Sequence, residues 1–216
     1  MSGPITLPLK TASGTRLVHK YYSGDRDPGA LLLALPGDHY GVDGPLLYYP
    51  TLALRQQGWS TLALTYGYQS AGDPFSLGAL PNMVQEVTAA LRAALERENP
   101  GWVALVGKSL GAALVATLAT SVPELESASL LYLTPPLDVP LFGPAFAETR
   151  QRSMIVIGTA DRFFDREVLE RMRSQRTFEL LEVEGADHSL IVAGDPAQTF
   201  RVLERVVGAA VDFLKG

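Results

Sequence analysis

Short aliphatic runs alternate along the chain with longer segments in which apolar residues recur at helical spacing. Residues 30–35 are apolar throughout, which is typical of a strand covered on both faces. Further strands are predicted at residues 5–10, 16–22, 60–65, 102–106, 128–133, 154–158 and 178–183, and helices at residues 46–57, 81–99, 109–122, 145–151, 165–173 and 196–214. This alternation predicts a three-layer α/β/α sandwich around a mostly parallel sheet of about eight strands.

The two longest connections have no room for an inserted lid domain. Residues 134–152 contain four prolines and leave space for one short helix, and residues 67–80 form the other excursion. The last predicted helix has apolar side chains at helical spacing, namely Phe200, Leu203, Val207, Val211 and Leu214. No internal repeat or linker interrupts the pattern, so we expect one domain over residues 1–216.

The composition is that of an ordinary soluble globular protein, with 47% hydrophobic and 19% charged residues among 216. The net charge of -5 gives no reason to expect a nucleic-acid or acidic-membrane partner. The N-terminus does not resemble a signal peptide, and no apolar stretch reaches the roughly 18 residues that span a bilayer. We therefore expect a cytoplasmic protein without a membrane partner, whose oligomeric state the sequence leaves open.

The cysteine and histidine content narrows the chemistry. The chain has no cysteine, which excludes disulfides, thiolate nucleophiles and cysteine-based metal sites. Its three histidines, His19, His39 and His188, stand far apart and form no paired metal-binding motif. The sequence therefore predicts neither a metal nor another cofactor. His19 alternates along an early strand, where a structural role is expected.

One segment, residues 103–114 with the sequence VALVGKSLGAAL, fits two motifs. Gly107-Lys108-Ser109 ends a phosphate-binding P-loop, but that loop needs a glycine where Trp102 stands. The intervening residues are strand formers that cannot wrap a phosphate. The same segment spells G-x-S-x-G, the turn between a strand and a helix that presents a nucleophilic serine. Gly107 and Gly111 suit that sharp turn, which makes Ser109 the candidate nucleophile.

A base and an acid for Ser109 lie just after later strands. His188 follows the last predicted strand, and histidine has the pKa that suits a general base for serine. Asp161 follows the strand at residues 154–158, at the same edge of the sheet, and would orient the histidine. The competing acids are Asp138, Asp165 and Asp187. Asp187 adjoins His188 and is too close in sequence to reach back to its ring, so Asp161 is the first choice.

The chain order Ser109, Asp161, His188 is that of α/β-hydrolases, and the sequence resembles a small member of this superfamily. GKSLG matches the nucleophile elbow, GTADRFF the acid loop and GADHS the histidine loop. The likeness runs from the early strand at residues 16–22 to the final helix, and its general pattern is that of lidless esterases and dienelactone-hydrolase-like proteins. The resemblance implies an α/β-hydrolase fold without a cap domain. It also implies a cofactor-free hydrolase that cleaves a small carboxylic ester or thioester through an acyl-enzyme.

The loop expected to complete the oxyanion hole departs from the superfamily pattern. Pro36 stands where a histidine is common, followed by Gly37 and Asp38. By position, the donors would be the backbone N–H groups of Leu110 and Asp38, with His39 as the alternative to Asp38. This departure keeps open a second interpretation, a non-catalytic α/β-hydrolase-like binding protein or complex subunit, although none of the three candidate catalytic residues is missing.

Weaker candidates surround these residues. Tyr40, Tyr66 and Phe163 fall in loops at the same edge and are candidates to line an apolar pocket for a small-molecule acyl substrate. Further loop aromatics are Tyr68, Phe75 and Phe164. Lys108, beside the candidate nucleophile, is expected to face solvent rather than to act as a base.

Overall fold

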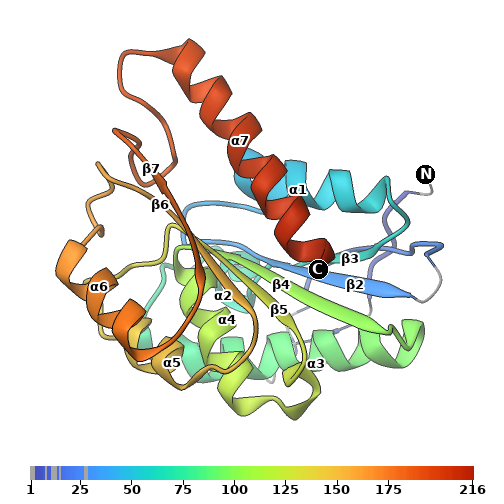
Figure 1. The fold of residues 1–216 in the computed structure, drawn as a ribbon. Helices are drawn as coiled ribbons and strands as arrows, with labels where there is room; N and C mark the ends of the chain where they lie inside the picture. The colour runs from blue at the N-terminus through green and yellow to red at the C-terminus, as the bar shows by residue number, and fades with distance from the viewer. Residues whose placement is uncertain (1–2, 8, 11–13, 15, 27–28) are drawn as a thin grey trace.

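The computed structural model describes residues 3–7, 9–10, 14, 16–26 and 29–216, and centres on a seven-stranded sheet (Figure 1). The strands are β1 (Lys20–Tyr22), β2 (Ala30–Leu35), β3 (Ser60–Ala63), β4 (Trp102–Lys108), β5 (Ser129–Leu133), β6 (Ser153–Gly158) and β7 (Glu179–Val183). They lie in the order β1-β3-β2-β4-β5-β6-β7. β1 is antiparallel to β3, and the other neighbours pair in parallel. The prediction of a mostly parallel sheet is therefore confirmed.

Helices cover both faces of this sheet, as the three-layer prediction requires. They are α1 (Pro45–Arg55), α2 (Gly67–Ala71), α3 (Leu80–Glu98), α4 (Leu110–Ser121), α5 (Gly143–Glu148), α6 (Arg166–Gln175) and α7 (Pro196–Lys215). α1 and α7 lie on one face, and α3, α4 and α5 lie on the other (Figure 1). Short 3-10 turns precede α3 at Leu77–Ala79 and follow α4 at Pro123–Leu125.

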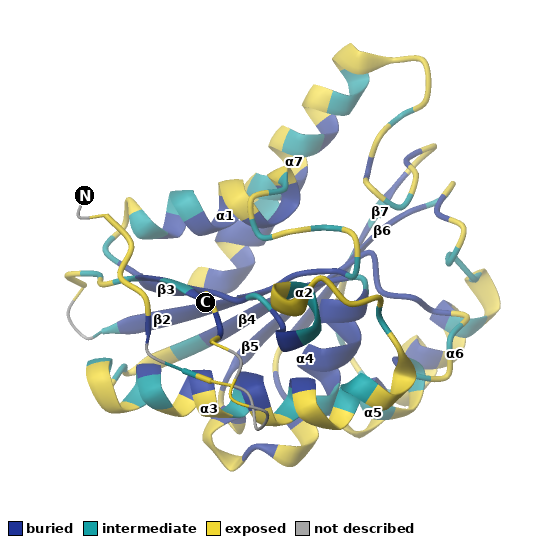
Figure 2. Cartoon of the chain, turned by 180° about the vertical axis from the view of Figure 1, so that it is seen from behind, coloured by how far each residue is buried: buried dark blue, intermediate teal, exposed yellow. Residues whose placement is uncertain are grey.

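The strand β2 shows why the centre of the sheet is apolar on both sides. Leu31, Leu33 and Leu35 join the core that includes α3 and α4. Leu32 and Ala34 join the core that includes α1 and α7. Burying a leucine side chain stabilises the fold by about 2 kcal/mol, and every residue of β2 is buried. The central strands are accordingly mostly dark blue in Figure 2.

The prediction of about eight strands is one too many for the described part of the chain, because residues 5–10 form no continuous strand there. Ile5 makes an isolated bridge with Tyr21, and Lys10 makes one with Arg16. Proline lacks the N–H that a strand ladder needs, and Pro8 interrupts this segment. Pro8 and residues 11–13 lie outside the described residues. The predicted strand at 16–22 is reduced to β1.

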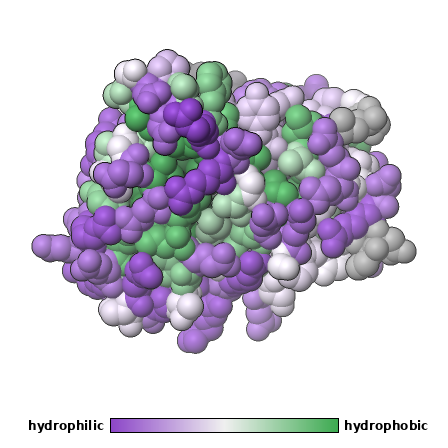
Figure 3. Space-filling model, turned by 45° about the horizontal axis from the view of Figure 1, so that its top comes forward, coloured by the Kyte–Doolittle hydropathy of each residue, from purple (hydrophilic) through white to green (hydrophobic). Residues whose placement is uncertain are grey.

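The buried stripe of α7 overlaps the predicted one in Val211 and Leu214, while Leu203 and Val207 are partly buried against the same core. The buried residues of α7 are Val202, Val206, Ala210, Val211, Phe213 and Leu214. Phe200 is 71% exposed, because it lies about 200° around the helix from Val202. Figure 3 looks onto the α1 and α7 side and shows hydrophobic (green) surface there among hydrophilic (purple) residues. None of the described helices is both long enough and apolar enough to cross a membrane.

Neither long connection holds a lid. Residues 134–152 contain α5, which is 6 residues long, close to the short helix predicted there. Residues 67–80, expected to be a loop, begin instead with α2, which ends at Gly72 with a left-handed φ of 76°. The arrangement over residues 29–216 is the α/β-hydrolase fold without an inserted cap.

The loops that carry the candidate residues leave the sheet at one edge. β2 leads to Pro36, β4 to Ser109, β6 to Asp161 and β7 to His188. Because these strands run in parallel, their carboxyl ends lie along the same edge, where the active sites of such sheets form.

Candidate active site

Ser109 occupies the sharp turn between β4 and α4. Its φ of 54° and ψ of -113° lie outside the regions that residues with a side chain normally adopt. The Ser109 N–H donates to the Leu133 carbonyl at 2.9 Å, which ties the residue to β5. Backbone strain of this kind persists only where the surrounding structure fixes it, and it is concentrated at functional sites.

The two glycines of the elbow are required by the close approach of backbone on either side of Ser109. A Cβ added to Gly107 would lie 2.3 Å from the Gly111 carbonyl oxygen, and a Cβ added to Gly111 would lie 2.3 Å from the Leu35 carbonyl oxygen. The strand, turn and helix therefore fit together only without these side chains. The P-loop alternative fails on the same segment, because the residues that would wrap a phosphate belong to β4.

His188 links Ser109 to Asp161 through its two ring nitrogens. Nε2 lies 2.9 Å from the Ser109 Oγ, and Nδ1 lies 2.8 Å from the Asp161 Oδ2. The loop that carries the histidine is shaped by Asp187, whose Oδ1 accepts two backbone N–H groups further along the same loop. The His188 side chain is 22% exposed, so the site is open to solvent.

The Asp161 side chain is fully buried, and both of its oxygens have partners. Oδ1 accepts the Phe163 N–H at 2.9 Å, while Oδ2 faces the His188 ring. A buried carboxylate is stable only with such partners. The other acids have different positions: Asp165 caps α6 by accepting the N–H of Val168, and Asp138 is exposed. The structure thus brings together the three residues chosen from the sequence.

Of the three aromatic residues predicted to line a substrate pocket, Phe163 lies at the site. Its ring packs edge-on against the His188 ring, with centres 4.9 Å apart. Tyr66 is buried and donates its hydroxyl to the Pro36 carbonyl at 2.9 Å, so the prediction that it lines the pocket is wrong. The Tyr40 hydroxyl accepts a backbone N–H at the start of α1. Both tyrosine hydroxyls therefore have internal partners and support the loop after β2.

That loop lies beside the first turn of α4. The Gly37 N–H donates to the Tyr40 carbonyl at 2.9 Å, which closes a turn over the two residues between them. A Cβ on the second elbow glycine would lie 2.6 Å from the Pro36 carbonyl oxygen, so the loop and the helix are in contact. Within residues 29–216, the N–H groups of Asp38 and Leu110 donate no hydrogen bond to the protein. Both are left available to a bound anion.

The Asp38 carboxylate is held by α2. Its Oδ1 accepts the Tyr68 hydroxyl at 3.0 Å, and its Oδ2 lies 3.2 Å from the His39 Nε2. Gln69 donates to the Gly37 and Asp38 carbonyls at 2.9 and 3.2 Å. Burial and the bond to Asp38 raise the pKa of Tyr68, which keeps its hydroxyl a donor at neutral pH. These contacts were not evident from the sequence, where Tyr68 was only one loop aromatic and Gln69 carried no signal.

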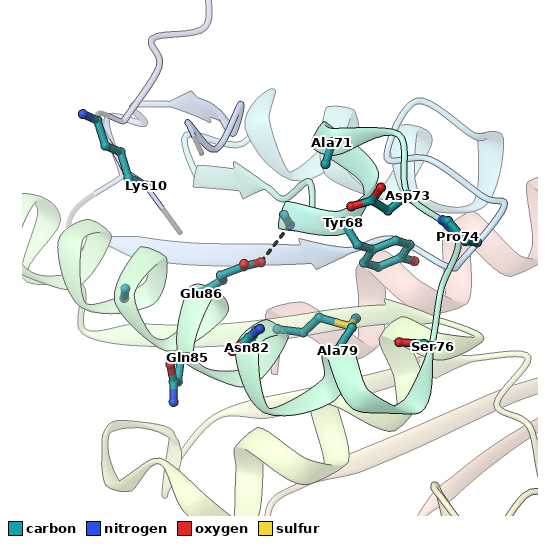
Figure 4. Close-up of a pocket in the computed structure, with 13 residues that line it drawn as sticks. Lys10, Tyr68, Ala71, Asp73, Pro74, Ser76, Ala79, Asn82, Gln85 and Glu86 are labelled. Atoms are coloured by element: carbon teal, nitrogen blue, oxygen red, sulfur yellow. Dashed lines mark hydrogen bonds between the residues drawn. The ribbon is translucent and has the colours of Figure 1, made fainter. Parts of the chain in front are cut away.

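The helix α2 is itself fixed by α3. The Glu86 carboxylate accepts the Gly67 N–H at 2.8 Å (Figure 4), and burial raises the pKa of Glu86. Beside this contact, residues of α2, α3 and the segment between them line a pocket of about 590 Å³ (Figure 4). Neither Ser109 nor His188 lines this pocket, so it is distinct from the site around the elbow.

The prediction that Lys108 faces solvent is wrong. The residue is 2% exposed, and its Nζ lies 5.2 Å from the centre of the Tyr40 ring. Burial lowers the pKa of Lys108 to about 8. The elbow turn is open at Ser109, but the loop after β2 covers the end of β4 one residue earlier.

Among the residues that the structure describes, no group of three or more His, Asp or Glu side chains is placed to hold a metal ion. The sequence prediction that the protein uses no cofactor stays a prediction.

The model of the alpha/beta hydrolase domain family matches residues 30–215. The chain therefore belongs to this family, and the matched region contains all of the candidate site residues. A comparison with the sequences of curated proteins gave no match.

Solved structures share the fold at low sequence identity. An α/β serine hydrolase homologue from Coxiella burnetii has a TM-score of 0.75 and 16% identity, with 98% of each chain covered. A lidless α/β serine hydrolase from Xanthomonas campestris has a TM-score of 0.74 and 15% identity, covering 100% of this chain and 95% of its own. A dienelactone hydrolase from Anabaena variabilis has a TM-score of 0.71 and 15% identity, covering 99% of this chain and 100% of its own. Fold and family together support a hydrolase.

Proposed function

We propose that the protein is a serine hydrolase that cleaves a small carboxylic ester or thioester through an acyl-enzyme on Ser109. The observation that carries this proposal is the hydrogen-bonded chain from the Ser109 hydroxyl through His188 to the Asp161 carboxylate, with contacts of 2.9 and 2.8 Å. A serine hydroxyl is a weak nucleophile unless a base takes its proton during the attack. His188 is the base within reach.

In the acylation half of the reaction, the Ser109 Oγ bonds to the substrate carbonyl carbon as its proton passes to the His188 Nε2. Asp161 accepts the Nδ1–H, which fixes the tautomer of the ring and stabilises the imidazolium that forms. The tetrahedral intermediate then collapses. The bond to the leaving alcohol or thiol breaks, and the leaving group takes the proton from Nε2.

The negative charge that develops on the substrate oxygen needs donors already in position. The N–H groups of Leu110 and Asp38 fit this role, because neither donates within residues 29–216 and the loop contacts the first turn of α4. The helix N-terminus adds a favourable potential for an anion. The Asp38 carboxylate accepts a hydrogen bond of 3.0 Å from the Tyr68 hydroxyl, so this negative charge has a partner in α2.

Deacylation repeats the same steps with water. His188 takes a proton from the water that attacks the acyl carbon, and the second tetrahedral intermediate expels the Ser109 oxygen. That oxygen regains its proton from Nε2, and the carboxylic acid leaves. No residue outside the three is needed for proton transfer.

The open site favours a small substrate. His188 is 22% exposed, α5 is the 6-residue helix of a connection with no lid, and Phe163 offers an apolar surface beside the histidine. A panel of p-nitrophenyl esters and acyl-CoA thioesters of graded chain length, with wild type and Ser109→Ala, tests the proposal. We expect turnover of short chains by wild type alone. Equal turnover by Ser109→Ala would refute the assignment.

A further inference from the structure

The Lys108 ammonium group is buried among the loops that carry the active site. Its Nζ lies 5.2 Å from the centre of the Tyr40 ring, and its Cδ lies 3.5 Å from the position of a Cβ on Gly37. The side chain therefore packs under the loop that carries Asp38, whose N–H has no acceptor within residues 29–216. The carboxylates of Asp161, on the acid loop, and of Asp187, on the histidine loop, favour the charged form of the amine.

Lys108 does not point toward the Ser109 hydroxyl. Side chains alternate along a strand, and Ala104 and Val106 belong to the core that includes α1 and α7. Lys108 lies on the same face of β4 as these two residues, and Tyr40 packs against the same core. Any influence of Lys108 on the reaction must therefore act through the loops around it.

A buried ammonium group does not by itself stabilise the folded state. Removing the charge from water is unfavourable, and a methionine would fill similar space without that cost. The Tyr40 ring offers a cation–π contact, and the Asp161 and Asp187 carboxylates favour the charged form, while Arg162 opposes it. These contacts offset only part of the cost of burying the charge, because burial still lowers the pKa of Lys108.

We propose that Lys108 is a positioning residue whose ammonium group, through Tyr40 and the two carboxylates, holds the Asp38 N–H in place for the oxyanion. The proposal rests on the serine-hydrolase function above. When the amine is neutral, the cation–π contact and the attraction to the carboxylates are lost, and the loop is free to shift. A shift of an oxyanion donor out of position slows the chemical step and leaves substrate binding largely unchanged.

The proposal gives a distinctive pH dependence. Burial lowers the pKa of Lys108 to about 8, so the amine loses its proton at moderately alkaline pH. Burial raises the pKa of Tyr40, so the ring that faces the amine stays neutral there. Because the folded-state pKa of Lys108 is below its value of 10.5 in the unfolded chain, deprotonation favours the folded state as the pH rises above about 8. Above about pH 8, activity is therefore expected to fall while the titration of Lys108 makes the folded state more stable. Unfolding does not explain a loss of activity in that range.

The test is the pH dependence of kcat and KM from pH 6 to 10 for wild type, Lys108→Met and Lys108→Arg. The substrate is p-nitrophenyl acetate, with Ser109→Ala as the blank for alkaline hydrolysis and thermal melts to monitor folding. We expect wild-type kcat to fall with a midpoint near pH 8. Lys108→Met should lose about 10- to 100-fold in kcat, with KM nearly unchanged and without the alkaline fall. Lys108→Arg, which stays charged, should keep its kcat above pH 8.

Wild-type kcat in Lys108→Met, or the same alkaline fall in that variant, would overturn the proposal. If Lys108→Met does not fold, the wild-type profile decides alone, and a flat kcat between pH 8 and 10 overturns it. Failure of the proposed function is distinguishable, because Ser109→Ala would then hydrolyse the ester as fast as wild type.

Discussion

The His188 Nε2 lies 2.9 Å from the Ser109 Oγ, although the two residues are 79 positions apart in the chain. Parallel strands bring the two loops to one edge of the sheet. The Asp161 carboxylate holds the other ring nitrogen at 2.8 Å, so the imidazole is fixed from both sides. Each contact in this chain can be broken by a single substitution.

Asp161→Asn should reduce kcat by about 10³- to 10⁴-fold, because an amide does not stabilise the imidazolium or select its tautomer. Steady-state kinetics with a short p-nitrophenyl ester measure the loss. Asp165→Asn is the matched control: asparagine still caps α6 in place of Asp165, so activity should stay within about twofold. Equal losses in the two variants would contradict the assignment of the acid.

The loop after β2 is tested by two substitutions at one position. Asp38→Pro removes the backbone N–H and should lower kcat by about 10²- to 10³-fold, the usual cost of an oxyanion donor. Asp38→Ala keeps the N–H and removes a carboxylate whose partners are Tyr68 and the exposed His39, so its kcat should stay near that of wild type. If thermal melts show that both variants are folded and Asp38→Pro is as active as Asp38→Ala, the His39 N–H becomes the donor to test.

The strained turn at Ser109 predicts a trade between stability and activity. Glycine adopts a φ near the observed 54° without the cost that a Cβ imposes. Ser109→Gly should therefore be more stable than Ser109→Ala by about 0.5 to 1 kcal/mol, with both variants inactive. Urea unfolding measures the difference. An alanine variant as stable as the glycine variant would show that the turn carries no strain.

His19 should make the fold sensitive to acid. It is buried, its Nδ1 accepts the Thr65 N–H at 3.2 Å, and burial lowers its pKa from 6.5 to about 4. As the pH falls below 6.5, His19 becomes protonated in the unfolded chain but stays neutral in the folded chain. The free energy of unfolding therefore decreases until about pH 4, by about 3 kcal/mol in all. His19→Asn keeps an acceptor and lacks the titration. Between pH 7.5 and 4.5, wild type should lose about 2.5 kcal/mol more than His19→Asn in urea unfolding. Equal losses would refute the shift.

Much of the site could be predicted because each catalytic candidate follows a strand that the hydrophobic pattern reveals. Ser109, Asp161 and His188 stand just past β4, β6 and β7, and the parallel arrangement then brings them to one edge. The elbow glycines are local as well, since their requirement comes from the strand–turn–helix unit itself and from its neighbour β2. Local pattern and topology were sufficient for these residues.

The surroundings of the site depend on contacts that no local pattern encodes. Lys108 is buried because the loop at Tyr40 folds over the end of β4. Tyr66 is internal because the Pro36 carbonyl, 30 residues earlier, needs a donor. The Asp38 carboxylate accepts a hydrogen bond from Tyr68 of α2, a helix that the sequence did not reveal. Each is a long-range pairing of polar groups, and such pairings become visible only with the folded chain.

The central claim is that Ser109 is an activated nucleophile, and covalent labelling with a fluorophosphonate followed by peptide mass spectrometry tests it most directly. An activated serine attacks the phosphorus, whereas an ordinary surface serine does not. We expect one adduct per wild-type chain, located on Ser109, with none in Ser109→Ala and much slower labelling in His188→Ala. An unlabelled wild-type protein, or an adduct on another residue, would contradict the proposed mechanism and favour a non-catalytic binding protein on the same fold.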